Sequence, residues 1–294
     1  GVIMRFQLDL TKEYGIVLEG GGARGSYQIG AWKALREAGI KIRGIAGASV
    51  GALNGALICM DDLEKAEEIW ENIRYSQVIN VDDDVIETVK KLDLKSLDLV
   101  KVAEDAKRIL KDKGLDITPL KNLIESVVDE DKIRSSDREL YLTTYSVTDR
   151  ELLVLNAKDI PDGEIGDMLL ASAYFPAFRN DKLGGKRYLD GGGWNNVPIN
   201  ILLEHDYKDI LVIRIYGLGY DSERTTEIPE DVHVTHIAPR QDLGGILEFD
   251  RTRARKNMTL GYYDAKRVLY GLEGRWDYLY APESDVYYFE RFLT

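Results

Sequence analysis

Two successive units of strand, glycine-rich turn and helix constrain this chain more than any other feature. The apolar segment 14–18 runs into glycines at 20–22, and apolar residues then recur at helical spacing over 26–38. A second unit of the same kind fills 42–60. Two such units within about fifty residues predict a parallel sheet with helices packed on it, so the expected fold class is α/β.

Patterns further along the chain predict a helical layer and additional strands. Charged stretches with one apolar stripe over 63–128 predict helices that form either a structural layer or a lid. Strands are expected at 140–147, 152–156, 209–216 and 232–237, and helices at 163–173 and from Leu243 onward. We expect one globule, in which a main domain over 14–200 carries C-terminal strands and a helical tail over 201–294.

Composition narrows the class of protein. A net charge of −12 with 44% hydrophobic residues fits a globular protein and argues against a nucleic-acid partner. The single cysteine, Cys59, cannot form an internal disulfide, so we expect a reducing, cytoplasmic compartment and at most a peripheral membrane contact. We find neither a secretory signal at residues 1–4 nor an apolar run of the roughly 18 residues that span a membrane. The oligomeric state has no signature.

The turn over 47–51 matches G-x-S-x-G, the pattern of a nucleophile elbow. Gly47, Ala48, Val50 and Gly51 surround Ser49, and such a sharp strand-to-helix turn lets the serine project its hydroxyl. Because a predicted helix follows directly, its N-terminus favours negative charge near Ser49. The alternative is a tight strand-to-helix turn without chemistry.

A glycine-rich loop is the second chemical candidate, with the residues Gly20, Gly21, Gly22, Ala23, Arg24 and Gly25. Consecutive glycines let backbone N–H groups converge on a phosphate or on the oxyanion of a tetrahedral intermediate. The loop lacks the Gly-Lys-Ser/Thr ending of a Walker motif, and 40–44 contains no acid for a dinucleotide ribose. Walker-type and dinucleotide binding are therefore disfavoured, and an oxyanion hole and another phosphate site both stay open. Arg24 either locks this loop or steers a phosphate headgroup.

A serine nucleophile needs a general base, and no catalytic motif surrounds the three histidines His205, His233 and His236. The better candidate is Asp190, in Asp190-Gly191-Gly192, where an acid meets flexible glycines after a hydrophobic pair. An ordinary Asp-Gly turn is the alternative. The acids, histidines and cysteine show no metal-ligand spacing, so we expect neither a metal nor a cofactor.

In this order, the three motifs resemble the signature blocks of the patatin-like phospholipase family over residues 14–200. The resemblance implies a three-layer patatin-like fold, with a mainly parallel central sheet flanked by helices. It also implies a serine acyl hydrolase with a Ser49–Asp190 dyad, an oxyanion hole around Gly21, Gly22 and Ala23, and a phospholipid or lysophospholipid substrate. The segment 171–176 resembles the family's stretch before the catalytic Asp, although Ala177 replaces a usual proline.

Two other functions stay open at this point. A general carboxylesterase or thioesterase on soluble acyl compounds would use the same dyad and loop, because neither distinguishes leaving groups. A non-catalytic regulatory protein could use the glycine loop to hold a lipid or phosphate. The basic run 251–256 is interpreted as a solvated surface rather than a lipid-docking patch. The sequence carries no pattern that identifies the headgroup, the acyl position or the chain length of the substrate.

Overall fold

The computed structural model describes residues 8–74, 118–173 and 195–271, together with Leu183, Lys186, Tyr188–Asp190 and Gly192. Within these residues, seven strands form one sheet in the order β4-β3-β2-β1-β6-β7, with β5 paired to β3. Strands β1, β2, β3, β6 and β7 are parallel, whereas β4 and β5 run antiparallel to β3. The strands are β1 (Glu13–Leu18), β2 (Lys41–Ala48), β3 (Glu139–Ser146), β4 (Glu151–Asn156), β5 (Tyr188–Asp190), β6 (Asp209–Ile213) and β7 (His233–Ile237).

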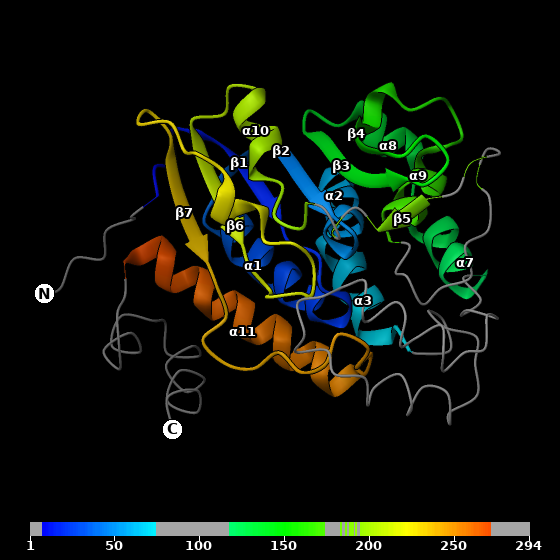
Figure 1. The fold of residues 1–294 in the computed structure, drawn as a ribbon. Helices are drawn as coiled ribbons and strands as arrows, with labels where there is room; N and C mark the ends of the chain where they lie inside the picture. The colour runs from blue at the N-terminus through cyan, green and yellow to red at the C-terminus, as the bar shows by residue number, and fades with distance from the viewer. Residues whose placement is uncertain are drawn as a thin grey trace, which may run out of the picture.

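Helices cover both faces of this sheet and make three layers (Figure 1). They are α1 (Ser26–Glu37), α2 (Val50–Met60), α3 (Leu63–Asn72), α7 (Thr118–Val127), α8 (Glu130–Ser135), α9 (Ile165–Ser172), α10 (Ile199–Glu204) and α11 (Arg251–Tyr270). Helix α10 packs on the face that carries Val17 and Ala46, and α1 and α2 pack on the face that carries Ile16 and Ile45. The predicted fold, a mainly parallel sheet flanked by helices, is confirmed.

Three predicted segments have different bounds in the structure. The helix expected from Leu243 begins at Arg251, because the Asp250 side chain caps it by accepting from the Thr252 and Arg253 N–H groups. The strand expected over 209–216 ends at Ile213. Of the helical layer expected over 63–128, α3 and α7 are present, and residues 75–117 lie outside the described residues.

Helix α11 packs tightly along α1 on the outside of the globule (Figure 1). A Cβ on Gly30 would lie 1.8 Å from the Met258 carbonyl oxygen, and one on Gly261 would lie 2.0 Å from that of Tyr27. Only glycine allows backbones to approach this closely. Helix α11 therefore packs directly against α1, the helix that follows the glycine loop.

Asp264 of α11 is buried against α1 and predicts a pH effect on stability. Its Oδ2 accepts from Tyr27 Oη at 2.9 Å, its Oδ1 lies 3.9 Å from Arg267 Nε, and Arg240 lies nearby. Burial raises the Asp264 pKa from 3.8 to about 6, although these partners oppose the shift. Because the pKa of Asp264 is higher in the folded than in the unfolded chain, its proton stabilises the fold. This stabilisation is fully present when the pH is below the unfolded-state pKa, and it is lost as the pH rises through about 6.

We expect Asp264→Asn, which mimics the protonated acid, to gain stability relative to the parent chain between pH 4 and pH 7, by at most about 3 kcal/mol. Urea unfolding of both proteins at each pH measures the difference. A difference in the free energy of unfolding that is the same at both pH values would contradict the prediction.

Candidate active site

The turn between β2 and α2 has the geometry of a nucleophile elbow. Ser49 takes φ 55° and ψ −122°, a conformation that costs a non-glycine residue about 1–3 kcal/mol. Close backbone contacts enforce the turn, because a Cβ on Gly47 would lie 2.4 Å from the Gly51 oxygen and one on Gly51 would lie 2.2 Å from the Leu18 oxygen. Both glycines of the motif are thus required by the packing of β1, β2 and α2.

Ser172, at the end of α9, holds the backbone of the elbow. The Ser49 N–H donates to Ser172 Oγ at 3.1 Å, and this hydroxyl donates in turn to the Thr143 carbonyl at 2.6 Å. Ala48 and Thr143 are the last paired residues of β2 and β3. The buried Ser172 hydroxyl therefore links the two strands where β2 leaves the sheet, and it satisfies an N–H group that the elbow turns out of the ladder.

We expect Ser172→Ala to lower kcat for ester hydrolysis by about 10- to 100-fold, with little change in KM, because the loss of this hydrogen bond lets Ser49, the candidate nucleophile, shift. Steady-state kinetics with a soluble ester measures the split. The control is Ile133→Val, which also removes one buried heavy atom but lies in α8, away from the elbow. An equal loss of kcat in both variants would show that Ser172 acts only through stability.

The glycine loop lies beside the elbow and offers two free donors. It forms a short 3₁₀ turn over Gly22–Gly25, and a Cβ on Gly20 would lie 3.1 Å from the Ser49 Cβ. The Ala23 N–H already donates to the Ile246 carbonyl at 2.7 Å. Within the described residues, the Gly21 and Gly22 N–H groups donate to no protein acceptor. Of the three N–H groups expected to act as oxyanion donors, that of Ala23 is already bonded, and those of Gly21 and Gly22 remain candidates.

Arg24 fastens the loop to two later segments of the chain. Its guanidinium donates to the carbonyl oxygens of Gly244 at 2.8 Å, Tyr216 at 2.5 Å and Ile215 at 3.4 Å. These contacts are all with backbone, so they favour the loop-locking role over the headgroup-steering role.

A buried ion pair below the loop was not anticipated from the sequence. Glu19, the residue before the loop, is 2% exposed and pairs with Arg214 at 3.0 Å. Its Oε1 also accepts from the Ile215 and Tyr216 N–H groups at 2.7 and 2.8 Å. Burial raises the pKa of Glu19, and Arg214 opposes that shift. The only signals in the sequence are single charges at the ends of two apolar strands.

A second buried polar network joins the loop to the helices. Gln28 Nε2 donates to the Glu19 carbonyl at 2.7 Å, and Asn54 Nδ2 donates to the Gly25 carbonyl at 2.9 Å and to Gln28 Oε1 at 2.8 Å. Trp70 of α3 donates to Asn54 Oδ1 at 2.9 Å. Because buried polar groups must be paired, this network fixes α1, α2 and α3 relative to the loop.

The sheet register brings Asp190 to the elbow. Strand β4 occupies one edge of β3, so β2 and β5 share the other edge. On that edge, Thr143 pairs with Ala48 of β2, and the next residue, Thr144, pairs with Asp190 of β5. Strand β5 thus pairs with the same edge of β3 from the point where β2 stops pairing, just before Ser49. The backbones of the two candidate dyad residues lie at the same point of the sheet although 141 positions separate them.

The histidines are placed elsewhere. His205 follows α10 and stacks on Tyr141, with ring centroids 4.4 Å apart. His233 and His236 lie on β7, which is separated from β2 by β6 and β1. His236 contacts Glu223. Among the residues that the structure describes, no group of three or more His, Cys, Asp and Glu could hold a metal ion.

Cys59 is buried in α2, and burial raises the pKa of its thiol to about 12. This placement agrees with a small hydrophobic residue in the core and argues against a reactive thiol.

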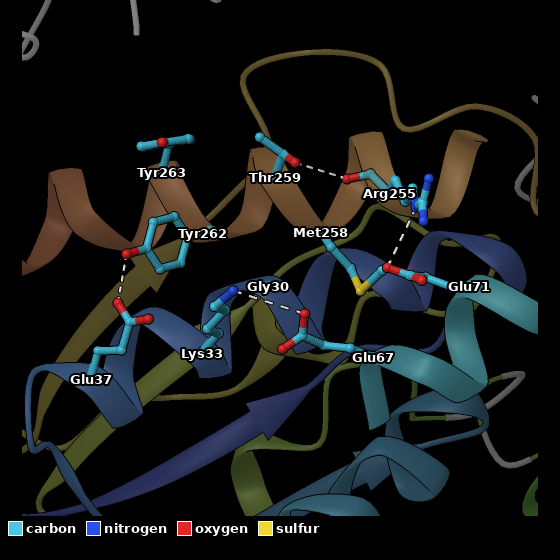
Figure 2. Close-up of a pocket in the computed structure, with 10 residues that line it drawn as sticks. All are labelled: Gly30, Lys33, Glu37, Glu67, Glu71, Arg255, Met258, Thr259, Tyr262 and Tyr263. Atoms are coloured by element: carbon cyan, nitrogen blue, oxygen red, sulfur yellow. Dashed lines mark hydrogen bonds and ion pairs between the residues drawn. The ribbon is translucent and has the colours of Figure 1, made fainter. Parts of the chain in front are cut away.

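A groove of about 390 Å³ lies between α1, α3 and α11, and none of the residues that line it belongs to the elbow (Figure 2). Its own charges are paired across it, since Lys33 lies 3.9 Å from Glu67 and Arg255 lies 3.5 Å from Glu71. Arg251 also approaches Glu71, at 3.8 Å. Two cations of the basic run 251–256, Arg251 and Arg255, thus form ion pairs with Glu71 of α3 at the surface.

The mainly parallel sheet with helices on both faces, and the strained turn at Ser49, define an α/β protein with the geometry of a nucleophile elbow. Residues 16–203 match the family model described as patatin-like phospholipase, and the chain belongs to this family of ester hydrolases. No helix within the described residues is long and apolar enough to cross a bilayer.

Curated relatives share a short segment with the chain. The chain is 58% identical over 50 residues to lysophospholipase nte1 of Aspergillus terreus, and the aligned segment covers 17% of this chain and 3% of that protein. It is 57% identical over 47 residues to neuropathy target esterase sws of Drosophila sechellia, which is 16% of this chain and 3% of that protein. The chain thus matches only a small fraction of the length of these relatives.

Among solved structures, VipD from Legionella pneumophila is similar, with a TM-score of 0.52 and 15% identity over 87% of this chain and 66% of that chain. This likeness supports the fold.

Proposed function

We propose that the protein is a serine acyl hydrolase that cleaves lipid esters, with Ser49 as nucleophile and Asp190 as general base. The observation that carries the proposal is the coincidence of two features at one point of the sheet. Ser49 is held in a strained elbow at the end of β2, and the register places Asp190 on the strand that continues β2 along β3. Family membership supports the same residues, because both lie within the matched segment.

The acylation step follows from these positions. Ser49 Oγ attacks the ester carbonyl carbon while its proton moves to the Asp190 carboxylate, and the carbonyl electron pair becomes an oxyanion. The Gly21 and Gly22 N–H groups and the N-terminus of α2 stabilise this oxyanion. The tetrahedral species then expels the alcohol, which takes the proton from Asp190, and leaves an acyl ester on Ser49.

Deacylation uses the same groups with water as nucleophile. The water oxygen attacks the acyl carbon while Asp190 accepts a proton from that water. The second tetrahedral species collapses, Ser49 recovers its proton from Asp190, and the fatty acid leaves. No step requires a metal or an organic cofactor. A carboxylate in water, with a pKa near 3.9, is a weak base for serine, so the bound substrate must exclude water from Asp190.

The proposed substrates are phospholipids or lysophospholipids, and the proposed location is the cytoplasm with peripheral contact to membranes. The name of the lysophospholipase relative favours this substrate class over soluble acyl esters or thioesters. The glycine loop by itself would equally suit a non-catalytic protein that binds lipid or phosphate.

The decisive experiment combines labelling with a substrate comparison. A fluorophosphonate should modify Ser49, located by peptide mass spectrometry, and the enzyme should hydrolyse lysophosphatidylcholine with a higher kcat/KM than p-nitrophenyl butyrate or a soluble acyl thioester. Absence of labelling would favour the binding protein. Labelling with a preference for the soluble ester or thioester would favour the general esterase.

A further inference from the structure

The segment Tyr216–Tyr220 crosses between the two halves of the proposed site, and we call it the tyrosine loop. A Cβ on Gly217 would lie 1.9 Å from the Gly20 oxygen, and one on Gly219 would lie 2.3 Å from the Gly192 oxygen. The Tyr220 N–H donates to the same Gly192 oxygen at 2.9 Å. The tyrosine loop therefore contacts the glycine loop at one end and the Asp-Gly motif at the other.

The two tyrosines that begin and end this loop are exposed. Tyr216 is 52% exposed and Tyr220 is 48% exposed, more than any other large hydrophobic residue that the structure describes. A solvated tyrosine ring keeps apolar surface in water, which proteins usually reduce by packing. Two such rings at the two ends of one short loop, beside one site, are suited to a shared contact surface.

Tyr216 is held in this position by buried charges. Its φ of 53° is rare for a bulky residue. Its N–H donates to Glu19, its carbonyl accepts from Arg24, and its ring lies 5.0 Å from the Arg214 guanidinium carbon. Side chains that also organise the glycine loop thus fix the backbone of Tyr216, while half of its surface faces solvent.

The chemistry of the loop fits a lipid–water interface. Tyrosine has an apolar ring and a polar hydroxyl, and such side chains concentrate where headgroups meet acyl chains. The chain carries a net charge of −12, so long-range attraction to anionic lipid does not favour docking. A zwitterionic surface entered by aromatic side chains is compatible with that charge.

We infer that the tyrosine loop is the docking surface through which the protein contacts lipid aggregates, and that docking there presents a lipid ester to Ser49. This inference rests on the proposed lipid-ester function. It assigns a partner to the only described exposed aromatic residues that border both the glycine loop and the Asp-Gly motif.

The test uses the full chain with Ser49→Ala, so that lipid binding is measured without hydrolysis. The probe is large unilamellar vesicles of phosphatidylcholine, and the readout is the partition coefficient from co-sedimentation. The variant is Tyr216→Asn with Tyr220→Ser, where asparagine suits the positive φ of position 216. Loss of two interfacial aromatic rings should lower the partition coefficient about tenfold.

The matched control is Leu10→Ser with Ile228→Ser, which removes two exposed apolar side chains near the amino ends of β1 and β7. Parallel strands place these ends opposite the proposed site, so the control should bind vesicles as the parent does. Failure of the parent to bind vesicles, an unchanged partition coefficient in the tyrosine variant, or an equal loss in the control would each overturn the inference. A protein partner for this surface would give the first outcome.

A second measurement separates docking from the proposed chemistry. With Ser49 intact, the ratio of lipid hydrolysis in vesicles to p-nitrophenyl butyrate hydrolysis should fall about tenfold in the tyrosine variant, in parallel with binding. If no ester is hydrolysed but binding changes as expected, the proposed function fails and the docking surface stands. If hydrolysis of both substrates falls equally while binding is unchanged, the docking inference fails and the hydrolase stands.

Discussion

Ser49→Ala is expected to lower kcat for ester hydrolysis by on the order of 10⁴- to 10⁶-fold, as removal of a serine nucleophile does in other hydrolases. The residual rate should come from substrate binding and from the glycine loop alone. Alanine keeps the strained backbone of position 49, so the thermal midpoint should change by only a few degrees. Kinetics with a soluble ester and circular dichroism melting measure both quantities.

Ser49→Gly is the matched control for the strain at the elbow. It should be equally inactive, but more stable than Ser49→Ala by about 1 kcal/mol, because glycine adopts φ 55° without steric cost. Equal stability of the two variants would show that the elbow is not strained. Retained activity in either variant would remove Ser49 from the mechanism.

Asp190→Asn completes this test from the other side of the proposed dyad. Loss of the base should lower kcat by a comparable factor and should also stop fluorophosphonate labelling, since Ser49 would keep its proton. Asp206→Asn is the control, because it makes the same isosteric change at the turn before β6, where asparagine tolerates the φ of 63°. A fully labelled Asp190→Asn variant would require a different base.

Gly22→Ala should lower kcat by about 10²- to 10³-fold, less than the loss of either proposed dyad residue and the size expected when one oxyanion donor is displaced. Gly22 has φ 58°, and a Cβ there would lie 2.2 Å from the Ile246 oxygen. The loop must shift to relieve this overlap, and the shift moves the Gly21 and Gly22 N–H groups away from Ser49. Rates with a soluble ester measure this loss.

Gly39→Ala separates the cost of the backbone conformation from the cost of the clash. Gly39 has φ 80°, yet nothing lies within 4 Å of its added Cβ. This variant should lose about 1 kcal/mol of stability and keep its kcat. If Gly22→Ala also keeps its kcat, the glycine loop does not stabilise the oxyanion.

Local patterns were sufficient to predict most of the fold and the elbow. The alternation of strand, glycine turn and helix over 14–60 specified β1, α1, β2 and α2, because each element depends on residues close in sequence. The elbow follows from the same stretch. Asp190 was a candidate base from its Asp-Gly-Gly context, but its placement beside the elbow depends on the register of β3, which no local pattern encodes. Its pairing with Ser49 in a dyad was expected from the resemblance of the three motifs.

The residues that support the site were missed for the same reason. Ser172 contacts Ser49 across 123 positions, and Arg214 contacts Glu19 across 195. Strand β6 ends three residues earlier than expected, because the Ile215 and Tyr216 N–H groups donate to the Glu19 carboxylate instead of to a neighbouring strand. Ala23 illustrates the limit most clearly, because the Ile246 carbonyl that accepts its N–H lies far away in the sequence.

The contacts that hold the glycine loop determine how much of the chain must be expressed for the loop to keep its shape. The family match ends at residue 203, but Arg24 and Ala23 are held by Tyr216, Gly244 and Ile246, and β6 covers the edge of β1. A fragment cut at the family boundary would keep all three motifs and lose what shapes them. The smallest fragment that keeps the glycine loop in place is therefore longer than the segment that matches the family model, and fusions should leave the chain intact up to Tyr270.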